Sequence, residues 1–506
     1  MPPGPGPRRA ILVSTVSVLA GGLASLVASL LLRVLMARAL DPASLGLVLL
    51  AIALVTPVGA IAGLGTNPAL AQRVAERRAR GEEAEARFLA RKGLLLAGAS
   101  GALAAAALAL LSPAAELLLG QPGLERALLP IAPVALGLAA GGAALGIARG
   151  SGDSVGRAVV RDAGGGLLRV LGVGAVLLSG SPSVAGIAGG FAAGSLLAEL
   201  LFVAYAAGQG WIARADRPAP EPLFPLLRPH AATEVLTQAG LWLDIVVLGA
   251  LAPPAVVGLY GVARGLTRVL DLVRQASSHG YLPTASALVA RGEEARLPAL
   301  HVGTRRFAFA LVWPVLAVCL LAPEPLLGLL FGQAYLPAAP ALRLLALGSF
   351  LASFFDYLDL LLLAERRPVD VLRTGLGGAA ALLVLLVLLV PRFGGEGAAA
   401  ALLGAGLLRG LLLFRQAFRF RPARPFLPAA TLPALLAAAS LLAAEPLVRL
   451  LQVSRVGALL VAGAAGGVAS TLALVSFLRA RDAGGDPAQP RSAPPAQKTS
   501  QASAAK

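Results

Sequence analysis

The sequence has few of the residue types that soluble proteins and most metal sites require. Charged residues make up 14% of the 506 residues, whereas a soluble globular protein carries about 25%. Cys319 is the only cysteine, so an intrachain disulfide is excluded. The three histidines, His230, His279 and His301, show no metal-ligand spacing. These shortages exclude an ordinary soluble fold and predict a chain that holds no metal.

Short catalytic motifs are also missing. The sequence contains no GxxxxGK(S/T) phosphate loop, no GxSxG nucleophile turn and no HExxH zinc motif. We therefore expect a protein that is not an enzyme, with no catalytic residues and no bound cofactor.

Apolar residues dominate what is present. They make up 57% of the chain, and the mean hydropathy is +0.80. Apolar runs of roughly 20 residues, the length that crosses hydrocarbon as a helix, recur from end to end. We predict an all-α polytopic membrane protein with about 14 transmembrane helices. The expected helices cover residues 11–36, 44–65, 93–111, 124–148, 160–178, 184–207, 231–251, 256–282, 308–330, 338–364, 369–390, 397–413, 426–447 and 456–478.

The basic residues predict the topology. The chain has 43 Lys and Arg against 26 Asp and Glu, a net charge of +17. With a cytoplasmic N-terminus, about 31 basic residues fall in cytoplasmic loops and about six in outer loops, as the positive-inside rule requires. Both termini are then cytoplasmic, and the charge needs no nucleic-acid partner. The charged connector 72–91 is expected to lie as a surface helix against anionic lipid headgroups.

The sequence also repeats itself at one offset. "ALDP" at Ala39–Pro42 returns as "ALAP" at Ala250–Pro253, 211 residues later, and "ARGEEA" at Ala79–Ala84 returns at Ala290–Ala295. "PAAELLLGQ" returns as "PLLGLLFGQ" 212 residues later. Three matches in order indicate a duplicated unit. Because six helices separate equivalent points, the two copies share one orientation in the membrane, and a substrate site is expected between them.

This repeat predicts two parallel six-helix lobes followed by two further helices. The expected divisions are a cytoplasmic N-terminus (1–10), an N-lobe (11–207), a cytoplasmic linker (208–230), a C-lobe (231–425), a helix pair (426–478) and a disordered cytoplasmic tail (479–506).

One predicted helix carries an unusual polar face. Tyr260, Arg264, Arg268, Asp271 and Gln275 fall within about 80° of one another on a helical projection. A charge at bilayer depth normally faces a cavity or a partner. The excess of arginine favours an anionic ligand, and the planar guanidinium suits phosphate. We predict that Tyr260, Arg264, Arg268 and Gln275 bind substrate and that Asp271 serves ion coupling or gating; a purely structural salt-bridge ladder is the alternative.

Six further charges lie inside predicted helices: Arg33, Arg169, Glu199, Asp244, Asp356 and Asp359. Arg33 and Asp244 stand 211 residues apart and carry opposite charge at equivalent points of the two lobes. They are expected to form a pair between the lobes that breaks during transport, or else to contact headgroups near helix ends. Asp356 and Asp359 are spaced to bind Na⁺ or H⁺ together, or to cap a loop. We assign Arg33 to substrate binding and the three aspartates to ion coupling or gating.

Several stretches resemble one known family. "RALDPASLGLVLLAIALVTPVGAIAGLG", "VVGLYGVARGL", "LLGLLFGQAYLPAAPALRLLALG" and "VPRFGGEGAAAALLGAGLLRG" look like bacterial polysaccharide flippases of the multidrug/oligosaccharidyl-lipid/polysaccharide (MOP) exporter superfamily. The resemblance implies two six-helix lobes around a cavity and alternating access driven by a Na⁺ or H⁺ gradient. It also implies an undecaprenyl-pyrophosphate-linked oligosaccharide as cargo, with Arg264, Arg268 and Arg33 as the cationic cavity.

The same resemblance implies a multi-pass protein of the bacterial inner (cytoplasmic) membrane that serves lipopolysaccharide or exopolysaccharide export. Its expected partners are the lipid-linked oligosaccharide, membrane lipids and the polysaccharide polymerase machinery. One departure is that residues 44–65 contain no charge, whereas the lipid II branch typically has cationic residues in this helix. The alternatives are an exporter of drugs or lipid II with the same fold and, as an enzyme, a membrane glycan polymerase or ligase. Such an enzyme is expected to carry a large outer loop, and the outer loops here are short.

Overall fold

A computed structural model describes the backbone of residues 7–180, 182–214, 223–355, 357–419, 422–426, 435–437, 439–440, 446 and 455–484. Within these ranges, side chains are described except at residues 7–19, 223–226, 229, 269–279, 455, 456 and 476–484. The described part of the chain is nearly all helical and contains no strand.

The helices follow one another with short connections. The first half contains α1 (Pro7–Ala39), α2 (Pro42–Ala62), α3 (Thr66–Ala79), α4 (Glu83–Leu110), α5 (Ser112–Leu119), α6 (Leu124–Ile131), α7 (Val134–Gly150), α8 (Ser154–Gly156), the π-helix η1 (Arg157–Gly164), α9 (Gly165–Leu178) and α10 (Val184–Gly208). The second half contains α11 (Leu223–Leu251), α12 (Pro254–Ala290), η2 (Glu294–Arg296), α13 (Leu297–Leu321), α14 (Pro323–Leu330), η3 (Gln333–Ala338), α15 (Ala339–Ser353), α16 (Leu358–Ala364), α17 (Pro368–Ala417), η4 (Arg424–Phe426) and α19 (Arg455–Gly484).

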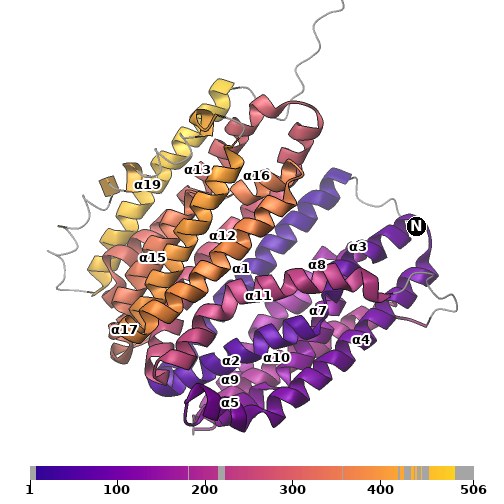
Figure 1. Ribbon diagram of the computed structural model, residues 1–506, viewed down its shortest axis with the longest axis vertical. Coiled ribbons are helices and arrows are strands. Elements are labelled where there is room, and N and C mark those ends of the chain that lie inside the picture. Colours follow the sequence, from indigo (N-terminus) through magenta and orange to yellow (C-terminus); the bar gives the residue numbers. More distant parts are fainter. Residues whose placement is uncertain are drawn as a thin grey trace, which may run out of the picture.

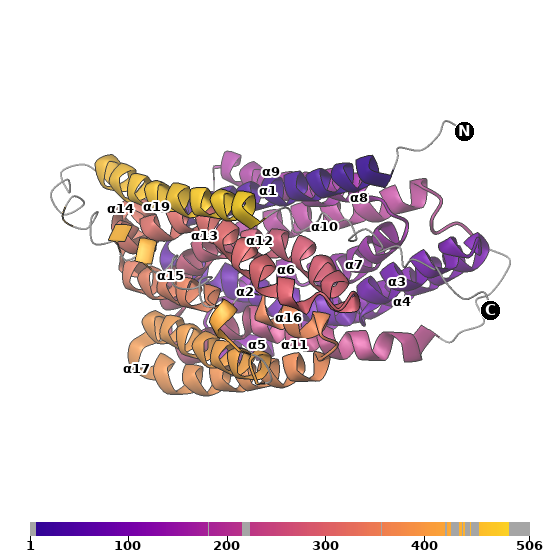
Figure 2. The same ribbon diagram turned by 90° about the horizontal axis from the view of Figure 1, so that it is seen from above.

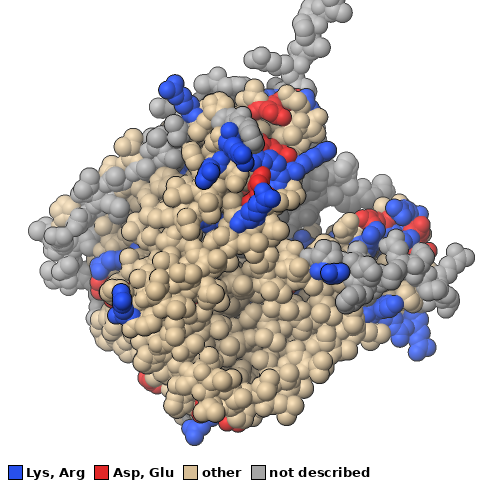
Figure 3. Space-filling model, viewed as in Figure 1, with Lys and Arg blue, Asp and Glu red and all other residues tan. Residues whose placement is uncertain are grey.

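Apolar side chains cover much of the outside of this bundle. Leu103, Leu117 and Leu178 are 73%, 83% and 90% exposed, as suits side chains that face lipid. In Figure 3 most charged side chains gather at the top and right of the view, a few lie at its left and lower margins, and a broad uncharged surface lies between them. Among the described residues, ten helical stretches are long and apolar enough to cross a membrane. The fold is therefore that of an all-α multi-pass membrane protein.

Two groups of helices flank a central set. Figures 1 and 2 show α13, α15, α17 and α19 on one side and α4, α7 and α10 on the other. Helix α12 lies between them, because it packs against α2 of the first half and against α13 and α15 of the second. Helix α1 packs against α9 and also touches α12. The polar face of α12 is thus placed where the two halves of the chain meet.

The two halves come closest where α2 and α12 begin. A Cβ atom on Gly46 would lie 1.8 Å from the carbonyl oxygen of Pro254, and a Cβ atom on Gly258 would lie 2.0 Å from that of Pro42. Only glycine fits at either position, because real Cβ contacts are never that short. Residues 42 and 46 correspond to residues 254 and 258 in the second half, 212 positions later. The two contacts are therefore equivalent, as a two-fold axis between the halves would make them.

Side chains close the same end of the molecule by capping helix ends. The buried Gln121 side chain donates to the carbonyl oxygens of Gly249 and Ala252, each at 2.8 Å, where α11 ends. The buried Tyr335 hydroxyl donates to the Leu40 carbonyl oxygen at 2.9 Å, where α1 ends. The last carbonyls of a helix have no partner within the helix. Here each is satisfied from the other half of the chain.

Some expected helices are divided or longer. The expected helix 338–364 is two helices, α15 and α16, and Tyr357 between them has a positive φ of 66°. The expected helix 308–330 begins earlier, at Leu297, and is divided between α13 and α14. The connector 72–91 is expected to be one surface helix, but it is divided between the end of α3 and the start of α4, with residues 80–82 outside both.

The expected helices 369–390 and 397–413 are both present within α17. The chain reverses at Gly394, whose φ of +54° and ψ of −126° are not helical. A Cβ on Gly378 would meet Arg409 and one on Gly404 would meet Leu385, so the two arms run antiparallel. The expected helix 426–447 lies largely outside the described residues, and 456–478 lies within α19.

Candidate functional site

The polar face of α12 begins at its second turn. Pro254 opens the helix at its first turn, where a missing N–H costs nothing. Tyr260, Arg264 and Arg268 follow at four-residue spacing and lie along one side of the helix, as the sequence predicts. Tyr260 is fully buried, and the arginine side chains are partly buried. Tyr260 and Arg264 share one partner on α11, whereas Arg268 contacts other groups of that helix.

Asp244 on α11 receives the first two of these side chains. One carboxylate oxygen accepts the Tyr260 hydroxyl at 2.7 Å and the Arg264 Nε at 3.2 Å. The other oxygen accepts the backbone N–H of Ile245 at 3.0 Å. The side chains of Asp244 and Arg264 are only 2% and 14% exposed. The positive charge of Arg264 is therefore matched by a buried negative charge.

Arg268 lies one turn further along α12 and contacts α11 differently. Its guanidinium donates to the Leu241 carbonyl oxygen at 2.9 Å. The guanidinium carbon also lies 4.5 Å from the centre of the Trp242 ring, the geometry of a cation–π contact. A carbonyl and an aromatic face of α11 thus hold the guanidinium in place.

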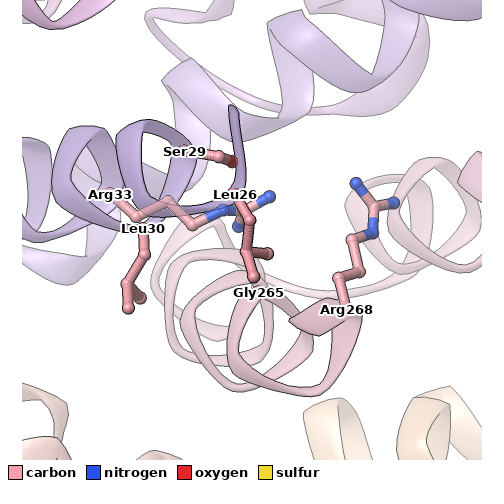
Figure 4. Close-up of a pocket in the computed structure, with 6 residues that line it drawn as sticks. All are labelled: Leu26, Ser29, Leu30, Arg33, Gly265 and Arg268. Carbon is pink, nitrogen blue, oxygen red and sulfur yellow. The ribbon is translucent and has the colours of Figure 1, made fainter. Parts of the chain in front are cut away.

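Arg33 reaches α12 from α1. Its Nη1 donates to the carbonyl oxygen of Gly261 at 2.9 Å. Figure 4 shows the Arg33 side chain crossing toward α12 near Gly265, with the Arg268 side chain rising from α12 beside it. The three arginines thus come from two helices, and two of them reach the same space.

That space is a small pocket of about 70 Å³ between α1 and α12. None of the six described residues that line it is acidic, and two are arginines (Figure 4). Guanidinium groups bind phosphate and carboxylate groups through charge-assisted hydrogen bonds. The pocket is therefore suited to an anionic group. The lining residues are Leu26, Ser29, Leu30, Arg33, Gly265 and Arg268.

The expected ion pair between Arg33 and Asp244 is not formed in this structure. The two residues do belong to one connected site, but the Asp244 carboxylate is occupied by Tyr260 and Arg264, which project from α12. Arg33 binds a backbone carbonyl of the same helix instead. The spacing of 211 residues between Arg33 and Asp244 could not reveal that Arg264, on α12, is the cation that pairs with Asp244.

The remaining predicted site residues divide into two groups. Asp359 accepts the backbone N–H of Leu360 at 2.9 Å, and its carboxylate lies 3.7 Å from the Arg409 guanidinium. It is therefore a helix-end carboxylate with a loose ion pair. Asp356 and the side chains of Asp271 and Gln275 lie outside the described residues, so the roles predicted for them stay predictions.

Trp242 and Gly265 are among the members of the site that were not predicted from the sequence. Trp242 supports Arg268, and Gly265 leaves room for Arg33. Gly265 directly follows Arg264, but glycine is so frequent in this chain, at 59 residues, that its position carried no signal. Within the described part of the chain, no group of three or more His, Cys, Asp or Glu residues could hold a metal ion.

Solved structures share this fold. A lipid II flippase MurJ in an inward closed conformation is 14% identical, covers 92% of this chain and 99% of its own, and gives a TM-score of 0.71. An inward-facing multidrug resistance MATE family transporter of the MOP superfamily is 15% identical, covers 80% and 96%, and gives 0.65. A MOP superfamily transporter from Pyrococcus furiosus is 15% identical, covers 84% and 97%, and gives 0.58.

Sequence comparison adds the family. The search of curated proteins found no match. The family described as polysaccharide biosynthesis protein matches residues 11–286, more than half of the chain. The fold resembles that of MurJ and MATE transporters, and the family match shows that this all-α multi-pass chain belongs to the polysaccharide biosynthesis protein family.

Proposed function

We propose that this protein is a flippase that moves an undecaprenyl-pyrophosphate-linked oligosaccharide from the inner to the outer leaflet of the bacterial inner membrane. The observation that carries the proposal is the pocket between α1 and α12, where Arg33 and Arg268 supply two positive charges at one place. The family match to polysaccharide biosynthesis proteins supports this class of cargo.

The chemistry of the headgroup fits the pair of arginines. A pyrophosphate carries about two negative charges, and burying them away from water is costly unless each is paired. Arg33 and Arg268 provide two guanidinium groups, each with several donors in a planar fork. A cationic drug would be repelled by the same pair, which makes a drug exporter the poorer alternative.

Alternating access is the proposed mode of movement. The pocket of about 70 Å³ is smaller than small-molecule sites of about 300–1,000 Å³, so the two halves of the chain have to separate to admit a headgroup. With a cytoplasmic N-terminus, the close crossing of α2 and α12 lies on the outer side, and the cargo enters from the opposite side. The fold shared with a lipid II flippase in an inward closed conformation is consistent with this arrangement.

A gradient of Na⁺ or H⁺ is the proposed drive, and no catalytic step is required. Asp244 is the carboxylate best placed for coupling, because it already holds Arg264 on the helix that contributes to the pocket. Asp359 is the second candidate. Both termini are proposed to be cytoplasmic, and the polysaccharide polymerase machinery is the proposed partner for the exported glycan.

The proposal is tested by binding of undecaprenyl pyrophosphate to purified Arg268 variants. Arg268→Gln removes one of the two charges and should weaken binding by about 1.5–3 kcal/mol, roughly ten- to a hundredfold. Arg268→Lys should recover only part of the loss, because a point charge lacks the bidentate fork. Arg343→Gln is the matched control, since Arg343 is 46% exposed and pairs with Glu324 away from the pocket. Unchanged affinity in Arg268→Gln would refute the assignment of the pocket to the headgroup.

A further inference from the structure

Gly265 lies under the guanidinium of Arg33. A Cβ atom on Gly265 would lie 2.7 Å from Nη1 of Arg33, 2.8 Å from its Cδ and 2.9 Å from its Cζ. All three distances are shorter than real Cβ contacts. The three nearest atoms all belong to one side chain, so even alanine at this position would force that side chain to move.

The geometry of a helix explains why this one position matters. Side chains on a helix lean toward its N-terminus, so residue 265 covers the turn that begins at residue 261. The carbonyl of Gly261 is the acceptor that holds Arg33. A backbone carbonyl has two lone pairs, so Gly261 can accept Arg33 in addition to its helical partner. Without a side chain at 265, this second acceptor direction stays open.

The position at which Arg33 contacts α12 lies about one turn from Arg268. Gly265 and Arg268 are three residues apart and therefore neighbours on one face of α12. Arg33 lies against Gly265 and lines the pocket together with Arg268 (Figure 4). Moving the Arg33 guanidinium off the helix would separate the two positive charges while leaving both in the protein.

We propose that Gly265 is a positioning residue that docks Arg33 onto α12, so that Arg33 and Arg268 act together on one diphosphate group. The proposal rests on the proposed function, because it takes the pocket to be the headgroup site. Gly265, which has no side chain, then sets the distance between the two positive charges. That distance determines the selectivity for a diphosphate over a single phosphate.

Packing alone is the competing explanation, and the two make different predictions. A glycine needed only for helix packing would affect stability regardless of what stands at position 33. A glycine that acts through Arg33 matters only while Arg33 is present. Among the described residues, no atom outside its own turn of α12 lies within 4 Å of the place that a Cβ on Gly280 would take, and Gly280→Ala is therefore the matched control.

The test is a double-mutant cycle on purified protein in lipid nanodiscs. The probe is undecaprenyl pyrophosphate, with undecaprenyl monophosphate for selectivity and undecaprenol as the uncharged control. Gly265→Ala and Arg33→Ala should each weaken diphosphate binding about ten- to a hundredfold, and both should reduce the preference for diphosphate over monophosphate. The double variant should bind no more weakly than Arg33→Ala, and Gly280→Ala should bind like the wild type.

The outcomes separate the two proposals. Unchanged binding in Arg33→Ala would overturn the proposed function. Loss in Arg33→Ala with none in Gly265→Ala would overturn only the positioning role, as would a further loss in the double variant. If Gly265→Ala does not fold, removing Arg33 as well should restore folded protein, because the clash is with that side chain. Failure of Arg33→Ala to restore it would refute the role of Gly265.

Discussion

Asp244 offers the sharpest test of how the charged site is held together. Its carboxylate accepts both the Tyr260 hydroxyl and the Arg264 guanidinium, and it is almost fully buried. Asp244→Asn keeps the shape of the side chain but removes the negative charge. Arg264, which is 14% exposed, would then lose the carboxylate of Asp244 while it stays largely buried. We expect the variant to be markedly less stable than the wild type.

The size of the effect follows from the burial of the pair. Removing one member of a buried ion pair costs about 3–5 kcal/mol, because the other charge stays desolvated. The amide oxygen can still accept the Tyr260 hydroxyl, so a value of about 3 kcal/mol is expected. Arg264→Gln in the Asp244→Asn background should recover much of this loss, since the charge that Asp244 neutralised is then gone.

The assay uses the only cysteine of the chain. Cys319 is buried, so a thiol-reactive fluorophore reports unfolding when the detergent-solubilised protein is heated. Asp359→Asn is the matched control, because the Asp359–Arg409 pair is longer, at 3.7 Å, and its side chains are 24% and 43% exposed. This control should lose less than about 1 kcal/mol. An Asp244→Asn protein that melts with the wild type, or shows no coupling to Arg264→Gln, would refute the reasoning.

Two further predictions concern the conformation and the topology. Gln121→Ala removes two hydrogen bonds to the end of α11, each worth about 1 kcal/mol. It should shift the equilibrium toward a state in which α2 and α12 are further apart at their first turns. Distances between spin labels on these turns measure this, and an unchanged distribution contradicts it. A topology reporter fused after Leu478, or inserted in the connector 72–91, should report the cytoplasm. An extracytoplasmic signal from either would reverse the proposed orientation.

Most helices could be predicted from the sequence because lipid imposes a simple rule. A run of about 20 apolar residues has to satisfy its backbone internally, and a helix does so without help from the rest of the fold. The division between α15 and α16 could not be predicted in this way. No glycine or proline stands near Tyr357 to mark it. The ring of Tyr357 is buried, and its centroid lies 5.3 Å from that of the Tyr281 ring. Contacts with residues far away in the sequence therefore stabilise the positive φ of Tyr357.

The candidate site was predictable in position but not in pairing. Helical spacing places Arg264 and Arg268 on one face of α12, and in sequence terms they are equivalent. Their difference arises from the packing of α11, which brings the Asp244 carboxylate to Arg264 and the Leu241 carbonyl to Arg268. Neither the rotation nor the axial position of α11 against α12 is encoded by periodicity within either helix. Contacts between distant segments can be known only once the helices are packed.

The crossing of α2 and α12 at Gly46 and Gly258 gives α12 the properties of a lever. Backbone meets backbone there, so the two helices are closest at this point and α12 is expected to rotate about it. At 1.5 Å per residue, Arg268 lies about 15 Å along the helix from Gly258, and Ala290 about 48 Å. A rotation of about 10° about this fulcrum would therefore shift Arg268 by about 3 Å and the far end by about 8 Å. The swing that opens the far end by about 8 Å would therefore also move one wall of the pocket by about 3 Å, so access and room for the headgroup would change together.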